Sequence, residues 1–330
     1  MIEAGAPVRV CDNGGWTDTW FGGPGRVLNV AVTPGVDVTI RRIDGPDPVL
    51  LDVENFGDRY AIVPGAPRFA RHPLLEAAID ALPPPADLAL EIRVGSVVPA
   101  GCGAGTSAAV AVAMLGALAA VRSEQPPPRD LAYAAHRLEV ETLGLESGIQ
   151  DQLSAAFGGI NYIEIEPYPQ ATVSTLPPWE ELDSRLTLVF LGRAHHSSAV
   201  HRAVIESAER EASPAFAQLR AAAGAARDAV VAHDFEAFGR AMTANTDAQR
   251  RLHPALVGAD AQRVISLAGS HGAVGWKVNG AGGDGGSVTI VSASRDTKSV
   301  FDRRAAELDA RYRVLPIRVS PVGFHARGTL

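Results

Sequence analysis

Lysine and cysteine are scarce in this sequence, and their scarcity excludes several classes of protein. Only two of the 330 residues are lysines, Lys277 and Lys298, and the net charge is −7 with no basic stretch. This balance argues against nucleic acid or an anionic membrane as the main partner. The two cysteines, Cys11 and Cys102, are too few for a disulfide framework. We therefore expect a cytoplasmic protein in a reducing compartment.

Long apolar runs and a leader pattern are also lacking. The longest apolar run, residues 108–121, is interrupted by Gly116 and is shorter than the roughly twenty residues that cross a bilayer. The first eighteen positions lack the basic-then-apolar pattern of a signal peptide. With 46% hydrophobic residues the chain can bury a full core. Alternating strand and helix patterns predict an α/β protein in two parts, residues 1–180 and 181–330, divided in a proline-rich and acidic region.

Glycine, by contrast, is abundant, and one glycine-rich loop stands out. Residues 98–109 read Val-Pro-Ala-Gly-Cys-Gly-Ala-Gly-Thr-Ser-Ala-Ala and follow a predicted strand. The alanine-rich run after them predicts a buried helix that starts near Ser107. Free amides at such a helix start bind anions, and Thr106 and Ser107 are placed to cap the helix or to bind a phosphate-bound Mg²⁺. The spacing fits neither a dinucleotide motif nor a Walker loop, and a plain tight turn is the alternative.

Charged residues gather in segments before and after this loop. Arg9 lies in a predicted strand, and Asp18 lies in the Gly-Gly turn after it. Glu139 lies beside the inner face of a predicted helix over 131–143, where an ordinary solvated glutamate is the simpler interpretation. Asp151 lies in a small-residue, apolar segment, where an unpaired buried polar group costs roughly 1–3 kcal/mol. The segment therefore indicates that Asp151 has a structural or functional role, and capping of a helix is one candidate for that role.

Two loops of the second part are candidates for ligand contact. Residues 280–286 hold five glycines between two predicted strands, whereas a simple hairpin needs about two turn residues. This excess predicts close approach of the backbone to a ligand. His195 and His196 lack the companions of a metal site, which favours a substrate-facing loop over a metal ligand set.

These segments resemble, in order and over nearly the whole chain, the GHMP kinase superfamily of galactokinase, homoserine kinase, mevalonate kinase and phosphomevalonate kinase. The central family motif Pro-x-x-x-Gly-Leu-Gly-Ser-Ser-Ala-Ala corresponds to residues 99–109, with Ala104 for leucine and Thr106 for the first serine. The third motif, Gly-x-Gly-Gly-Gly, corresponds to the last glycine loop, where Asp284 interrupts it.

The details of the resemblance point to the sugar-kinase branch. Arg9 and Asp18 stand at the nine-residue separation of that branch, and Glu139 precedes Asp151 by the twelve residues seen between its metal-binding glutamate and catalytic aspartate. The sequence Gly-Gly-Trp-Thr-Asp-Thr at 14–19 and Gln-Asp-Gln at 150–152 are similar to bacterial heptose-phosphate kinases and fucokinase-type enzymes.

The resemblance implies a fold and a reaction. The fold is a two-domain GHMP kinase fold, with an N-terminal α/β domain that has a left-handed crossover, a C-terminal ferredoxin-like domain and an active site between them. The reaction is ATP-dependent phosphoryl transfer to a hydroxyl of a sugar or sugar phosphate, first of all the anomeric hydroxyl of a heptose 7-phosphate. An unphosphorylated sugar such as fucose is the alternative substrate, and a non-catalytic sugar and nucleotide sensor is the alternative function. We expect a monomer or homodimer without nucleic-acid or membrane partners.

The resemblance also implies roles for individual residues. Asp151 orients or deprotonates the attacking hydroxyl with the help of Arg9, and Ser107 and Glu139 hold Mg²⁺. The residues expected to bind ATP are Pro99, Gly101, Cys102, Gly103, Ala104, Gly105, Thr106 and Ser107. The residues expected to bind the substrate are Gly15, Thr17, Asp18, Arg193, His196, Gly282 and Gly283. A substrate phosphate would add Arg41, Arg42 and His195 as candidates.

Overall fold

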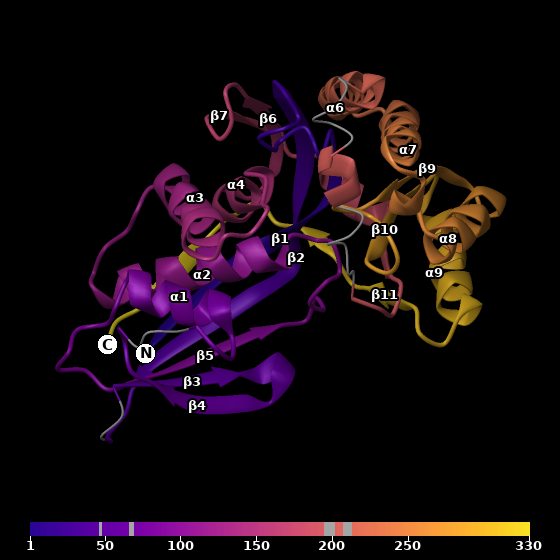
Figure 1. Cartoon of the computed structure of the whole chain (residues 1–330). Helices are drawn as coiled ribbons and strands as arrows, with labels where there is room; N and C mark the ends of the chain where they lie inside the picture. Colours follow the sequence, from indigo (N-terminus) through magenta and orange to yellow (C-terminus); the bar gives the residue numbers. More distant parts are fainter. Residues whose placement is uncertain (46–47, 66–68, 195–201, 207–212) are drawn as a thin grey trace.

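The computed structural model describes residues 1–45, 48–65, 69–194, 202–206 and 213–330. Within them, nine strands form a large sheet and four form a smaller one. Figure 1 shows the large sheet with one group of helices in one half of the molecule, and the smaller sheet with a second group in the other half. Among the described residues no helix combines the length and apolarity needed to span a membrane.

The large sheet is built around one long strand. Its strands are β1 (Ile2–Asn13), β2 (Gly25–Arg42), β3 (Val49–Val53), β4 (Asp58–Ile62), β5 (Leu90–Ser96), β6 (Ile160–Ile165), β7 (Ala171–Leu176), β12 (Arg318–Val319) and β13 (His325–Gly328). The order is β13-β1-β2-β5-β3-β4, with β6 and β12 also on β2 and β7 on β6. β3 and β5 pair in parallel through a connection that contains β4 and a helix. The left-handedness of this crossover stays a prediction.

The continuity of β2 differs from what the sequence indicates. Pro34 and Gly35 suggest a bend between two strands at 27–32 and 36–40, yet the structure runs one strand through them. The reason lies in the neighbouring strand: a Cβ on Gly35 would come within 2.1 Å of the Ala6 carbonyl oxygen. Glycine therefore permits close approach of β1 rather than a break.

Helices of the first group cover the large sheet. They are α1 (Pro73–Ala81), α2 (Thr106–Val121), α3 (Pro128–Arg137) and α4 (Gln150–Phe157), with short turns η1 (Glu54–Phe56) and η2 (Leu138–Thr142). α2 packs on β1 and β2 and is flanked by the other three helices. Small side chains let these elements approach, which explains why the core helix is rich in alanine.

Two glycines in helix interiors provide a matched stability test. A Cβ on Gly116 of α2 would lie 2.2 Å from the Phe324 ring, whereas a Cβ on Gly224, in α6 (Pro214–Ala232), would meet no atom within 4 Å. We expect Gly116→Ala to lower the free energy of unfolding by about 1–3 kcal/mol through overpacking. Gly224→Ala should raise it by about 0.5–1 kcal/mol because alanine restricts the unfolded chain. Urea unfolding measures both, and equal midpoints would contradict the packing argument.

The smaller sheet has the predicted ferredoxin-like topology. Its strands are β8 (Leu186–Phe190), β9 (Ala273–Val278), β10 (Ser287–Ser292) and β11 (Arg313–Leu315), all antiparallel in the order β11-β8-β10-β9. In chain order this is 4-1-3-2, the split βαβ arrangement. Its helices are α6, α7 (Phe235–Leu252), α8 (Ala259–Ser270) and α9 (Arg295–Leu308), and two short turns are η3 (Glu180–Ser184) and η4 (Pro254–Leu256).

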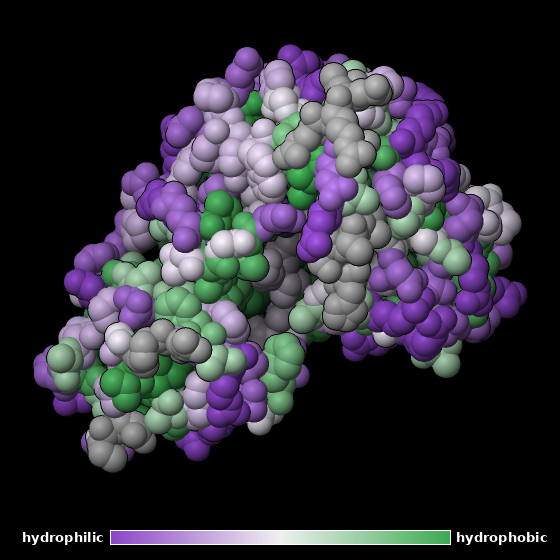
Figure 2. Space-filling model, viewed as in Figure 1, coloured by the Kyte–Doolittle hydropathy of each residue, from purple (hydrophilic) through white to green (hydrophobic). Residues whose placement is uncertain are grey.

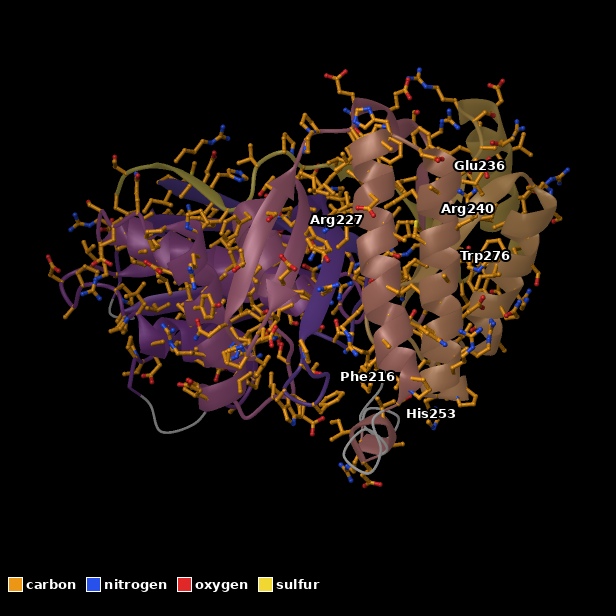
Figure 3. The ribbon with its side chains drawn as sticks, turned by 90° about the horizontal axis from the view of Figure 1, so that it is seen from above. Phe216, Arg227, Glu236, Arg240, His253 and Trp276 are labelled. Carbon is orange, nitrogen blue, oxygen red and sulfur yellow. The ribbon has the colours of Figure 1, made fainter. Side chains whose placement is uncertain are left out.

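α6 connects the two halves. It lies alongside α7, with Phe216 near one end and Arg227 farther along (Figure 3). Phe216 packs against Phe21, with 6.2 Å between ring centroids, and the Arg227 guanidinium lies 4.8 Å from the ring centroid of Tyr162 on β6. The halves therefore share an interface along the large sheet.

The chain finally returns to its first sheet. β12 pairs with β2 and β13 pairs with β1, so the Met1 amino group donates to the Thr329 carbonyl oxygen. Figure 1 shows the two chain ends side by side. The division at residues 180 and 181 stays a prediction, and the structure adds that residues beyond 317 complete the large sheet.

Candidate active site

A cleft of about 410 Å³ opens between the two halves. Figure 2 shows the hollow in the molecular surface. Its walls come from the end of β1 and the turn after it, the glycine-rich loop at the start of α2, residues 146–151, and residues 280–281 of the last glycine loop, with Ile205. Segments far apart in the sequence thus meet in one place, as the predicted site requires.

The glycine-rich loop has the backbone shape that exposes amides. Gly101, Gly103 and Gly105 all have positive φ, between 70° and 75°, and Gly105 is the N-cap of α2. A Cβ on Gly105 would lie 3.1 Å from Asp151 Oδ2, so this position also needs glycine for space. Thr106 and Ser107 line the cleft. A helix start of this kind favours a phosphate group.

Three of the residues expected to bind ATP do not line the cleft. Cys102 and Ala104 are fully buried in the hydrophobic core, and burial raises the pKa of the Cys102 thiol to about 11. Pro99 accepts a hydrogen bond from the Cys102 amide and does not line the cleft. Within residues 101–105 the glycines therefore line the cleft, while Cys102 and Ala104 between them pack into the core and support the loop.

Arg9 and Asp151 form a two-pronged ion pair in the cleft. Arg9 Nε donates to Asp151 Oδ1 at 2.8 Å and Nη2 donates to Oδ2 at 3.0 Å. Nη1 donates to the Gly103 carbonyl oxygen. Arg9 is buried on β1, while the Asp151 side chain at the start of α4 retains 24% exposure. Such bidentate pairs fix both partners in one geometry, so Asp151 is oriented and still open to a ligand.

Asp18 is held beside this pair by the turn before α4. Gln150 donates to it from the main-chain N–H at 3.3 Å, and a Cβ on Gly148 would lie 2.0 Å from Asp18 Oδ2. Burial, together with the nearby Asp151 charge, raises the pKa of Asp18 to about 6. The site therefore contains a carboxylate that titrates near neutrality.

Glu139, the predicted metal ligand, does not itself line the cleft, but it lies next to Ser147, which does. It lies in the π-helical turn η2, is buried, and its Oε2 accepts hydrogen bonds from Ser147 and Gln152. Its Oε1 is buried and accepts no hydrogen bond from the described residues. Burial, together with the Asp151 charge, raises the pKa of Glu139 to about 7, against the hydrogen bonds from Ser147 and Gln152. A cation between Ser107 and this oxygen would satisfy the unpaired acceptor.

No group of three or more potential metal-ligating side chains occurs in the part of the chain that the structure describes. Mg²⁺ in kinases is held by one or two carboxylates together with substrate phosphates. The donor set of Ser107 and Glu139 fits that pattern.

Several residues expected to contact the substrate lie outside the cleft lining. Gly15, Gly282 and Gly283 are not among the lining residues. The Thr17 hydroxyl donates to the Gly14 carbonyl oxygen and accepts from the Arg26 N–H. Arg193 binds Asp260 and Asp284 at the surface. Asp284, which interrupts the third glycine motif, therefore has a structural role as a partner of Arg193. His196 and His195 fall outside the described residues.

The structure also adds residues that the sequence reasoning missed. Asp12 lines the cleft and pairs with Lys277, a fully buried lysine. Trp16, Trp20 and Phe21 form an aromatic wall. The available signals were the isolated lysine three residues before the last glycine loop and the aromatic cluster at 16–21.

Comparisons with known proteins find similarity to GHMP kinases and to sugar kinases. The family model for the N-terminal domain of GHMP kinases matches residues 73–159, which span the glycine-rich loop, Glu139 and Asp151. The D-glycero-alpha-D-manno-heptose 7-phosphate kinase of Campylobacter jejuni is 26% identical over 203 residues, 60% of either chain. The bifunctional fucokinase/GDP-fucose pyrophosphorylase of Arabidopsis thaliana is 24% identical over 92% of this chain and 31% of that one.

A solved structure shares the fold throughout. The D-glycero-D-manno-heptose 1-phosphate kinase from Bacteroides thetaiotaomicron has a TM-score of 0.77 at 21% identity and covers 99% of both chains. The aligned segments span less than two thirds of the length of either curated relative. This chain is therefore similar to GHMP kinases over residues 73–159, and it shares the fold of a solved heptose kinase over nearly its whole length.

Proposed function

We propose that the protein is a kinase that transfers the γ-phosphoryl group of ATP to a hydroxyl group of a sugar or sugar phosphate. The Arg9–Asp151 pair beside the glycine-rich helix start carries this proposal. It puts an oriented carboxylate, a guanidinium and free amides around one cleft. Phosphoryl transfer relies mainly on such positioning and charge neutralisation.

Each group has a part in the proposed reaction. Amides of the glycine-rich loop and the start of α2 bind the phosphates of ATP, and Asp18 accepts hydrogen bonds from sugar hydroxyls. Asp151 orients the attacking hydroxyl and accepts its proton as the new O–P bond forms and the bond to ADP breaks. Arg9 holds the Asp151 carboxylate in place through two hydrogen bonds and offsets negative charge on the transferred group.

Ser107 and Glu139 would hold Mg²⁺. The ion would neutralise charge on the phosphates when bound. The unpaired Oε1 of Glu139 supports this assignment.

A heptose 7-phosphate is the first candidate acceptor, with the anomeric hydroxyl as the reacting group. The Campylobacter relative, named for that substrate, supports it. Its existing phosphate would require cations. Two of the cations considered for that role already have acidic partners: Arg41 pairs with Glu91, and Arg193 binds acidic side chains. Arg41, Arg42 and Arg193 are all absent from the cleft lining.

An uncharged sugar such as fucose is the second candidate, and the charges in the cleft favour it. Among the described lining residues Arg9 is the single cation, and it is already bonded to Asp151 and Gly103. The same lining holds four carboxylates and an aromatic wall on which a sugar ring can pack. The fucokinase in the name of the Arabidopsis relative agrees with such a substrate.

A panel of sugars and sugar phosphates, assayed by ADP release with ATP and Mg²⁺, tests these proposals. Turnover of a heptose 7-phosphate but not of neutral sugars supports the first candidate, and the reverse supports the second. Binding of ATP and sugar without turnover at any Mg²⁺ concentration would identify a sensor and contradict the kinase proposal.

The raised pKa of Asp18 predicts the pH dependence of sugar use. Because a carboxylate accepts hydrogen bonds from hydroxyls and a carboxylic acid accepts them less well, kcat/KM for the sugar should fall by about tenfold per pH unit below about 6. The protonated form is also favoured by the folded state, so ionisation of Asp18 costs stability as the pH rises from about 4 to 6. Steady-state rates at saturating Mg²⁺ measure the profile. Asp18→Asn should remove this acid limb, and an unchanged limb in that variant would contradict the assignment.

A further inference from the structure

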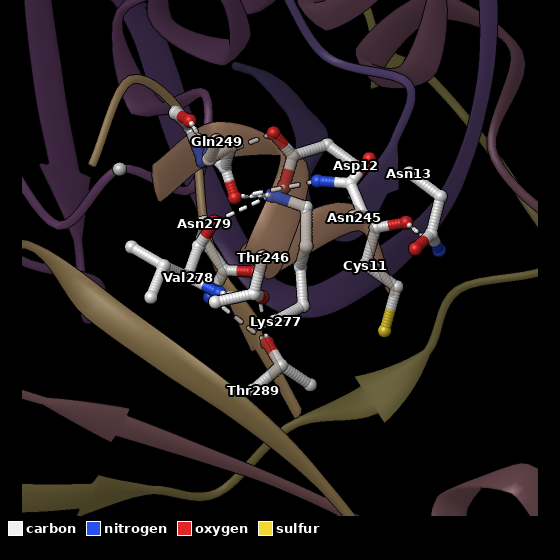
Figure 4. A network of polar contacts seen from close by, with 12 residues as sticks. Cys11, Asp12, Asn13, Asn245, Thr246, Gln249, Lys277, Val278, Asn279 and Thr289 are labelled. Carbon is white, nitrogen blue, oxygen red and sulfur yellow. Dashed lines mark hydrogen bonds and ion pairs between the residues drawn. The ribbon is translucent and has the colours of Figure 1, made fainter. Parts of the chain in front are cut away.

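Lys277 is a charged side chain with no exposure to solvent. It lies on β9 with 0% exposed surface. Its ammonium group lies 3.2 Å from Asp12 Oδ1 and donates at 3.2 Å to Gln249 Oε1 and also to the Val278 carbonyl oxygen (Figure 4). Burial lowers the pKa of Lys277, and the charge of Asp12 opposes that effect. Two oxygens therefore accept hydrogen bonds from the ammonium group, and Asp12 supplies the opposite charge beside it.

Asp12 lies between this lysine and the proposed catalytic arginine. It is fully buried at the end of β1, and its Oδ1 is 3.9 Å from Arg9 Nη1. Arg9 therefore has two carboxylates within reach, Asp12 and Asp151, and it binds Asp151 through both Nε and Nη2. Among the described residues, Arg9 and Lys277 are the cations that pair with Asp12.

Removal of the lysine charge changes this balance. A buried carboxylate without its partner is strongly destabilised, and Arg9 is the remaining cation near Asp12. The guanidinium would then be drawn from Asp151 towards Asp12. We propose that Lys277 is a positioning residue for phosphoryl transfer: it neutralises Asp12, so that Arg9 remains paired with Asp151. The inference rests on the proposed kinase function.

The same network positions the last glycine loop. Gly280 donates its N–H to Asp12 Oδ2 at 3.0 Å and accepts a hydrogen bond from Gln249 Nε2 at 3.1 Å. A Cβ on Gly280 would lie 2.9 Å from the Gly103 carbonyl oxygen, so the two glycine loops touch. Asn245, next to Gln249 on α7, also accepts from the Gly14 N–H at 2.6 Å. Asp12 and Gln249, two of the partners of Lys277, therefore both bind Gly280 in the last glycine loop.

The kinetic test uses the two lysines of the chain. Lys277→Met keeps the side-chain length and removes the charge. Its kcat should fall by about 10²-fold, the loss typical of small misplacements in an active site, while KM for ATP changes much less. Lys298→Met is the matched control, because Lys298 pairs with Asp302 on α9 away from the cleft, and its kcat should be unchanged. The double variant Lys277→Met/Asp12→Asn removes the competing carboxylate and should regain at least tenfold in kcat.

These variants separate positioning from mere structural support. If Lys277→Met folds and its kcat stays within twofold of the wild type, the inference is overturned. If that variant does not fold, the double variant decides: kcat near the wild-type value supports the inference, and activity as low as that of Asp151→Asn overturns it.

A readout without turnover keeps this inference separate from the proposed function. With ¹⁵N-labelled lysine the protein has two side-chain signals, and Lys298→Met assigns them. An ammonium signal of Lys277 at pH 7 that shifts in Asp12→Asn is expected, because the group is shielded and paired with Asp12. A neutral amine or an unshifted signal would overturn the inference even if the kinase is active. If no sugar or sugar phosphate of the panel is phosphorylated although Lys277 gives the expected ammonium signal, the kinase proposal is rejected instead.

Discussion

Replacement of Asp151 by asparagine is expected to lower kcat by roughly 10²–10⁴-fold, the usual contribution of a general base. Asparagine keeps the size of the side chain and its oxygen, so Arg9 retains one hydrogen bond, but the amide accepts no proton from the sugar hydroxyl. The nucleotide contacts of the glycine-rich loop are untouched. ATP binding by calorimetry and kcat by ADP release therefore separate the two functions.

Asp228→Asn is the control for this experiment. Asp228 lies on α6, is 70% exposed at its side chain, and pairs with its neighbour Arg227. Its replacement should leave kcat unchanged. Near-normal turnover of Asp151→Asn with normal ATP binding would show that Asp151 is not the catalytic aspartate.

Loss of Arg9 should have an effect of similar size. Arg9→Met removes both bonds to Asp151 and leaves it beside Asp12 and Asp18 without their shared cation. We expect kcat to fall by on the order of 10³-fold, as for charge-stabilising arginines of phosphoryl transfer. Urea unfolding of the variant measures the folded fraction, to which the rate is normalised.

Coupling between the two residues gives a sharper version of the same experiment. Because Arg9 acts through Asp151, Arg9→Met/Asp151→Asn should be hardly slower than the worse single variant. Arg227→Met, which removes an arginine from the ring of Tyr162, serves as a control with unchanged kcat. Strictly multiplicative losses in the double variant would mean that Arg9 and Asp151 act independently.

The local parts of the site could be predicted from the sequence. The glycine-rich loop could be recognised in the sequence because its positive φ angles favour glycine, which leaves a glycine-rich pattern. A helix-forming run directly after it marks where the helix begins. The meeting of Arg9 and Asp151, 142 residues apart, followed from the family resemblance and not from residue patterns. The ferredoxin-like strand order had the same origin.

Other features depend on tertiary packing and left no periodic signal. Which loop residues face the core was not apparent, because Cys102 and Ala104 look no different from cleft residues in sequence. Thr17 carries a hydroxyl that suits a sugar, yet the main chain of the turn uses it. The pairing of Asp12 with Lys277 joins β1 to β9 and exists only when both halves of the fold are in contact.

The return of β13 to β1 has a consequence for the order of folding during translation. One edge of β1 pairs with residues 325–328, which are translated long after β1 itself. While the intervening chain is synthesised, that edge offers unpaired N–H and C=O groups to any extended segment nearby. The chain is thus open to wrong pairing at this edge of β1 until residues 325–328 have been synthesised, and the large sheet is completed only then.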